Sequence, residues 1–199
     1  MIDNLENIIP LLVFQEGHFY EVMILQRKKD NPEAINRQNV RLIKHYIVDS
    51  LDYLMLRYDE MKTLADTFNA RVYIKLGSYS KEKLGFKILE TLSHKLINQD
   101  LKFSNLVSKS IGNMIPSTKY WIVDVDYDNV SLNEVLRIKT VINDCNPNGR
   151  NIIGDIPTPN GVHIITRPFN TQQFLTYQDV CYKVEIKKNN PTILYSNIK

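Results

Sequence analysis

The second half of the sequence arranges strand-like and helix-like stretches in one particular order, which constrains the fold more than any other feature. An apolar run at 119–126 precedes a helical pattern from Ser131, where Ser131 and Glu134 have the spacing of a capping box. Two strand-like runs joined by PTPN follow, then a short helical stretch near 171–177 and a final pair of strand-like runs. The order is therefore strand, helix, hairpin, helix, strand.

This order is that of an RRM-like (ferredoxin-like) antiparallel sheet with its helices packed on one face, so we predict an α+β fold. The first half adds strand-like runs at 18–26 and 41–48, separated by a charged loop. From Ser50, apolar residues recur at helical spacing up to Phe68, and a strand at 70–78, a helix at 81–99 and an irregular stretch at 100–118 follow. We predict an N-terminal α/β lobe (1–69) packed beside an RRM-like lobe (70–199) as one compact unit.

Composition places the chain among folded proteins: it is 43% hydrophobic and 24% charged. Because no run approaches the ~20 apolar residues of a membrane span, we expect a soluble, cytoplasmic protein that does not bind membranes. Cys145 and Cys181 lack CxxC spacing, so we expect two buried free thiols and neither a disulfide framework nor a cysteine zinc site.

Basic residues are concentrated between positions 71 and 119, where the sequence has nine Lys or Arg and three acidic residues. Such a surplus suits a phosphate backbone, and Arg71 and Lys75 on the expected strand are candidates to contact nucleic acid. The alternative is an ordinary solvated helix face, because lysines are common on exposed helices.

The strand-like run at 119–126 ends in an unusual pair of carboxylates. Asp124 and Asp126 should project from the same face with Cα atoms about 6–7 Å apart. Such a pair repels unless a cation neutralises it, and Mg²⁺ favours carboxylate oxygens together with water and phosphates. The alternative is a turn in which Asp126, Asp128 and Asn129 cap the strand exit.

The second strand of the expected hairpin carries His163 and Arg167 on one face, about 13 Å apart at their Cα atoms. A histidine can contact a phosphate or orient a sugar, and an arginine suits phosphate recognition. Alternatively, His163 is a packing residue and Arg167 marks the rim of the sheet.

Taken together, these motifs resemble the archaeo-eukaryotic primase superfamily, which includes primases, primase-polymerases and the polymerase domains of bacterial end-joining ligases. Asp124 and Asp126 match its paired metal ligands, and Thr158, Gly161 and His163 match its S-G-x-G-x-H motif. Thr158 stands where serine is usual and Pro159 where glycine is usual. For the third acid of the family, we favour Glu185 over Asp179.

The resemblance implies a metal-dependent nucleotidyltransferase that adds nucleotides to a 3′ end or makes a primer on a DNA template. Asp124, Asp126 and Glu185 would bind Mg²⁺ or Mn²⁺, with Asp124, Asp126 and His163 as catalytic residues. The nucleotide-binding residues would be Thr158, Gly161, His163 and Arg167. The implied partners are a DNA template, nucleoside triphosphates and replication proteins such as a helicase.

Two other functions fit the same residues. A metal-dependent nuclease or phosphodiesterase can also use paired carboxylates and a histidine. A non-catalytic RRM-like module would instead stack bases on Tyr73, Tyr120 or Trp121, although the sequence lacks the aromatic RNP motif of RRM domains.

Overall fold

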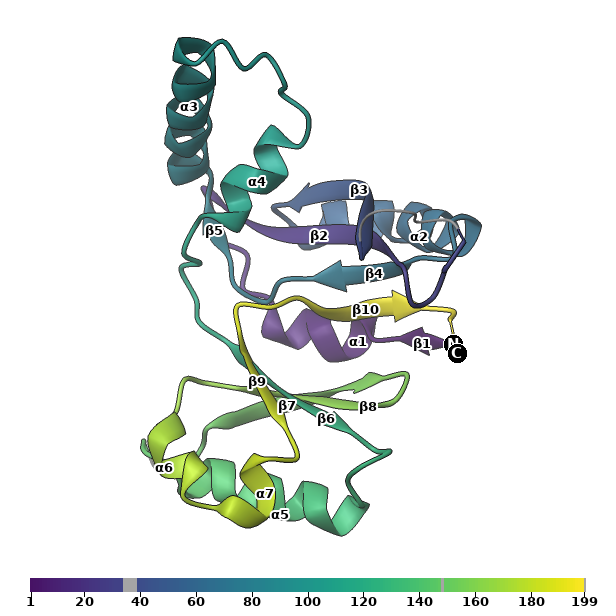
Figure 1. Cartoon of the computed structure of the whole chain (residues 1–199), viewed down its shortest axis with the longest axis vertical. Coiled ribbons are helices and arrows are strands. Elements are labelled where there is room, and N and C mark those ends of the chain that lie inside the picture. Colours follow the sequence, from purple (N-terminus) through teal and green to yellow (C-terminus); the bar gives the residue numbers. More distant parts are fainter. Residues whose placement is uncertain (34–38, 148, 199) are drawn as a thin grey trace.

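The computed structural model describes residues 1–33, 39–147 and 149–198. Within these ranges the chain forms two antiparallel sheets and seven α-helices, which confirms the α+β class. The two sheets lie one above the other (Figure 1). The N- and C-terminal ends lie side by side, because β1 pairs with the final strand β10.

The first sheet has the strand order β1-β10-β4-β2-β3, with β5 paired to β2. Its strands are β1 (Ile2–Asp3), β2 (His18–Arg27), β3 (Val40–Val48), β4 (Arg71–Ile74), β5 (Tyr79–Ser80) and β10 (Thr192–Ser196). The predicted helix after Ser50 is α2 (Leu51–Thr67), and the Ser50 hydroxyl caps it by accepting from the Tyr53 N–H. Helix α1 (Leu5–Ile8) continues into a 3₁₀ turn (Ile9–Leu11). The apolar side of α2 packs on the face of this sheet that carries Val22 and Val72, whereas Arg71 and Tyr73 lie on the other face, toward the second sheet.

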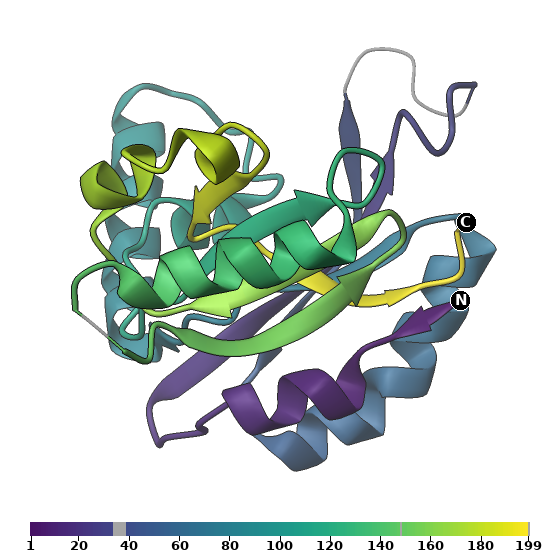
Figure 2. The same ribbon diagram turned by 90° about the horizontal axis from the view of Figure 1, so that it is seen from below.

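The second sheet has the order β7-β8-β6-β9. It contains β6 (Trp121–Asp126), α5 (Leu132–Asp144), β7 (Ile152–Thr158), β8 (Gly161–Thr166), α6 (Thr171–Leu175), α7 (Gln178–Cys181) and β9 (Glu185–Lys188). The predicted capping box is confirmed at the start of α5. Figure 2 shows α5, with α6 and α7 beside it, on the face of this sheet turned away from the first sheet.

Helices α3 (Lys81–Ile97) and α4 (Leu106–Gly112) project from one end of the first sheet (Figure 1). A small apolar cluster joins them to the sheet, formed by Phe19, Tyr79, Leu84, Ile111 and Met114. Helix α4 lies in the stretch 100–118 that was predicted to be irregular, so that prediction was wrong for residues 106–112.

The division between the sheets differs from the predicted boundary between residues 69 and 70. Strand β4 lies between β2 and β10, so residues from both predicted lobes build the first sheet. The second sheet occupies only the segment from β6 to β9. Three of its residues, Ile122, Ile156 and Ile165, join the apolar core of the first sheet, so the two sheets share buried packing.

No helix in the described ranges combines the length and apolar character needed to cross a membrane. Both cysteines are free thiols, as predicted, but Cys145 is buried whereas Cys181 is partly exposed. Cys181 ends α7 at the edge of the second core, where its side chain is not enclosed.

Candidate active site

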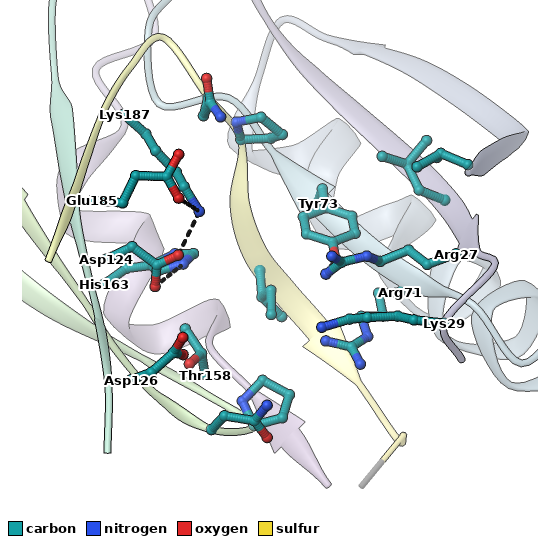
Figure 3. Close-up of a pocket in the computed structure, with 17 residues that line it drawn as sticks. Arg27, Lys29, Arg71, Tyr73, Asp124, Asp126, Thr158, His163, Glu185 and Lys187 are labelled. Carbon is teal, nitrogen blue, oxygen red and sulfur yellow. Dashed lines mark hydrogen bonds and ion pairs between the residues drawn. The ribbon is translucent and has the colours of Figure 1, made fainter. Parts of the chain in front are cut away.

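A cleft of about 520 Å³ lies between the two sheets. In Figure 3, acidic residues and a histidine from the second sheet face arginine and lysine residues from the first, with β10 running between them. We term the side with Asp124, Asp126, His163 and Glu185 the acidic wall, and the side with Arg27, Lys29 and Arg71 the basic wall.

The acidic wall begins on β6. Side chains at Ile122, Asp124 and Asp126 share one face of this strand; Ile122 enters the shared core, whereas both carboxylates line the cleft. On β9, Glu185 is the residue directly opposite Asp124 in the strand pairing, and it also lines the cleft. The structure therefore brings the three predicted metal-binding acids to one wall.

Asp124 is the most strongly contacted of these acids. Lys187 Nζ lies 2.5 Å from its Oδ2 and His163 Nε2 lies 3.4 Å from its Oδ1. Burial raises the pKa of this carboxyl, but hydrogen bonds from His163 and Lys187 outweigh burial and lower the pKa to about 2. Asp124 is therefore ionised at neutral pH.

His163 connects the two sheets. It stands opposite Asp124 in the pairing of β6 with β8, and its ring is buried. Its Nδ1 lies 2.8 Å from the hydroxyl oxygen of Thr192, which belongs to β10 of the first sheet. The imidazole is thus held at both nitrogens, with Nε2 directed at the acidic wall.

The turn between β7 and β8 closes one end of the cleft. Thr158, Pro159 and Asn160 line the cleft there. Gly161 does not line it among the described residues; instead it pairs with Asp126 on β6 and packs against the β6 backbone. Of the predicted nucleotide-binding residues, Thr158 and Gly161 therefore lie beside Asp126, whereas His163 lies beside Asp124.

The basic wall consists of Arg27, Lys29 and Arg71 (Figure 3). Arg71 is largely buried and its Nη2 donates to Asp30 Oδ1 at 2.8 Å, while its buried Nε has no partner among the described residues. Arg27 Nη1 lies 3.3 Å from the Tyr73 hydroxyl. Sequence reasoning selected Arg71 but missed Arg27 and Lys29. The cluster RKK at 27–29, which begins at the last residue of β2, was the available signal.

Two predicted site residues, Lys75 and Arg167, are not among the described residues that line the cleft. Lys75 points along the first sheet to Glu21, with Nζ 2.8 Å from the buried Oε2, so its charge is used within the fold. Arg167 is exposed and follows the end of β8, where its N–H donates to the Asn151 carbonyl oxygen. Strand β8 ends at Thr166, so Arg167 lies one residue beyond the strand on which we expected it to share a face with His163.

Asp124, Asp126 and Glu185 differ in how well they are placed to bind a metal ion. Among the residues described, no group of three or more His, Cys, Asp or Glu side chains is arranged to hold a metal ion. The Glu185 side chain is 73% exposed and pairs with Lys187. Asp124 and Asp126 remain as a carboxylate pair facing the cleft. Mg²⁺ is commonly held by one or two carboxylates together with water and substrate phosphates, so these donors fit an ion that arrives with a phosphate-bearing substrate.

The aromatic residues considered for base stacking lie in different places. Tyr73 lines the cleft beside Arg27. Trp121 faces the helix-covered side of the second sheet, where its ring packs against Phe169 with centroids 5.5 Å apart. The described surface of the second sheet therefore does not present Trp121 as a stacking platform beside Asp124.

Comparisons of this chain with protein-family models, with curated proteins and with solved structures gave no match.

Proposed function

We propose that this protein is a primase-like nucleotidyltransferase that transfers nucleotides to a nucleic-acid 3′ end, or to a new primer, on a DNA template. The observation that carries the proposal is the meeting of Asp124, Asp126 and His163 in one cleft, opposite the basic wall. These residues are up to 39 positions apart in the sequence, and a turn cap would not require a histidine or a basic wall opposite it.

The second sheet supports the same proposal. Its chain order of strand, helix, hairpin, helices and strand, with the spatial order β7-β8-β6-β9, is the order that we expect of an RRM-like sheet. Asp124 and Asp126 lie at the end of β6, which pairs with the hairpin strand that carries His163, as expected for the archaeo-eukaryotic primase superfamily. In this proposal the first sheet serves as the α/β lobe that closes the cleft.

Each wall has a distinct role in the proposed reaction. Asp124 and Asp126 would hold Mg²⁺ or Mn²⁺, which when bound supplies Lewis-acid stabilisation of the phosphates and of the attacking 3′-hydroxyl. His163, fixed by Thr192, would orient the incoming nucleotide. Arg27, Lys29 and Arg71 would neutralise phosphate charge.

The direct test is incorporation of labelled ribo- and deoxyribonucleotides on a DNA template, with and without a primer, in Mg²⁺ or Mn²⁺. We expect products longer than the primer that require nucleoside triphosphates and that disappear when EDTA removes the metal. The proposal fails if no product forms under any of these conditions.

The same assay separates the two alternatives. A nuclease or phosphodiesterase would shorten the labelled oligonucleotide without added triphosphates. A non-catalytic RRM-like module would bind the oligonucleotide and leave its length unchanged in the presence of every metal and nucleotide.

A further inference from the structure

Lys187 contacts two carboxylates of the acidic wall at once. Its Nζ lies 2.5 Å from Asp124 Oδ2 and 3.2 Å from Glu185 Oε2. Because Glu185 stands opposite Asp124, and Lys187 is two residues further along β9, the ammonium and both acids share one face of the sheet. Lys187 therefore contacts Asp124, one of the two acids on which the proposed function places a metal ion.

Of the two residues whose side-chain nitrogens contact Asp124, His163 and Lys187, Lys187 is the one that can leave. His163 is buried and held from its other nitrogen by Thr192. Lys187 carries its charge on a flexible four-carbon stem at the edge of an open cleft, with 24% of its side chain exposed. An ammonium and a divalent cation on the same carboxylate repel each other, and Lys187 Nζ occupies Asp124 Oδ2, so an ion that binds this oxygen displaces Lys187.

We propose that Lys187 is an exchangeable counter-ion of Asp124, which a metal ion displaces and which then binds a phosphate group of the incoming nucleotide. This inference rests on the proposed function, because it concerns the same metal and nucleotide. Binding of the metal ion and binding of the nucleotide both require the Lys187 ammonium to move away from Asp124, so each strengthens binding of the other. The protein would therefore bind the metal weakly until a triphosphate is present.

The neighbouring residue provides a matched control. The Lys188 side chain lies on the opposite face of β9, with Nζ 4.5 Å from the centroid of the Trp121 ring. Lys188→Met removes the same charge as Lys187→Met, one residue away, without removing a contact to Asp124.

The test is a titration with Mn²⁺ of the wild type, Lys187→Met, Lys188→Met and Asp124→Asn, with free Mn²⁺ measured by electron paramagnetic resonance. Each titration is run without nucleotide and with a non-hydrolysable nucleoside triphosphate analogue. Without nucleotide, we expect Lys187→Met to bind Mn²⁺ at least about fivefold more tightly than the wild type. The analogue should then increase Mn²⁺ affinity less in Lys187→Met than in the wild type, while Lys188→Met matches the wild type.

Failure of this inference and failure of the proposed function give different results. If Asp124→Asn abolishes Mn²⁺ binding but Lys187→Met binds no more tightly than the wild type, the metal site stands and the exchange is wrong. If Asp124→Asn binds Mn²⁺ like the wild type, the metal site and the exchange are both wrong. Thermal unfolding checks that each variant is folded, and Lys187→Gln repeats the test if Lys187→Met is not.

Discussion

Gly161 lies so close to Val125 that a Cβ on Gly161 would be 1.9 Å from the Val125 carbonyl oxygen. The contact joins β8 to β6 at the pair Gly161–Asp126, between the carboxylates and the turn that closes the cleft. A side chain here must push the two strands apart. The requirement for glycine is thus steric, and it concerns the distance between Asp126 and the hairpin.

We expect Gly161→Ala to lower the free energy of unfolding by about 1–3 kcal/mol, the usual cost of overpacking, and to reduce nucleotide incorporation. Gly154→Ala on β7 is the matched control, since no heavy atom lies within 4 Å of its Cβ position, and we expect a change within about 0.5 kcal/mol. Urea unfolding measures the change in the free energy of unfolding for both variants. Equal effects of the two substitutions would contradict the steric explanation.

Thr192 positions His163, so its hydroxyl should affect activity more than folding. Thr192→Val keeps the shape of a fully buried side chain but removes the hydrogen bond to His163 Nδ1. We expect incorporation to fall about three- to tenfold, the equivalent of one hydrogen bond, whereas Thr192→Ser should restore it. Steady-state kinetics of the three proteins check this. Equal losses in both variants would show that packing, and not the hydroxyl, is what matters.

Lys29 lines the cleft, whereas the neighbouring exposed Lys28 does not line it among the described residues. We expect Lys29→Gln to weaken binding of an oligonucleotide and to reduce the slope of log K against log salt by about one, as for the loss of one phosphate contact. Lys28→Gln should leave both quantities near the wild-type values. Fluorescence anisotropy over a range of salt concentrations measures them, and indistinguishable variants would mean that the basic wall does not bind the backbone at Lys29.

Glu21 should make the fold sensitive to acid. Burial raises the pKa of its carboxyl, but a hydrogen bond from His45 and the charge of Lys75 outweigh burial, so the pKa lies below the ordinary value of 4.5. A carboxyl with a lowered pKa in the folded state stabilises the protein above its unfolded-state pKa, and this stabilisation is lost as pH falls through the folded-state value.

The free energy of unfolding should therefore fall as the pH drops below about 4.5, the ordinary pKa of glutamate. Glu21→Gln, although less stable at neutral pH because it leaves Lys75 buried without its partner, should show a flatter dependence in this range. Denaturant unfolding at a series of pH values measures the slopes. Parallel slopes in the two proteins would exclude Glu21 as the source.

Features set by neighbouring residues were predictable from the sequence. Helix α2 and the Ser131–Glu134 capping box follow from apolar spacing and local hydrogen bonds. Helix α4 gave no such signal: it has seven residues, and its N-cap Asn105 adopts φ 60 without a side-chain cap hydrogen bond.

Long-range pairing was not predictable. Alternation identifies β4 as a strand but does not reveal that it lies between β2 and β10, and this error displaced the predicted boundary between the lobes. The acidic wall could be predicted from the sequence because Asp124, Asp126 and His163 follow the two-residue periodicity of strands. Lys187 was missed, although its spacing of two residues from Glu185 on an expected strand already placed both on one face.

The most direct measurement of the central claim is template-dependent incorporation by Asp124→Asn and Asp126→Asn, with Asp128→Asn as the control. Asp128 is exposed in the turn after β6 and does not line the cleft among the described residues. We predict that each of the first two substitutions lowers incorporation by at least about 100-fold in a protein that circular dichroism shows to be folded, while Asp128→Asn retains it. Wild-type incorporation by folded Asp124→Asn and Asp126→Asn would contradict the account.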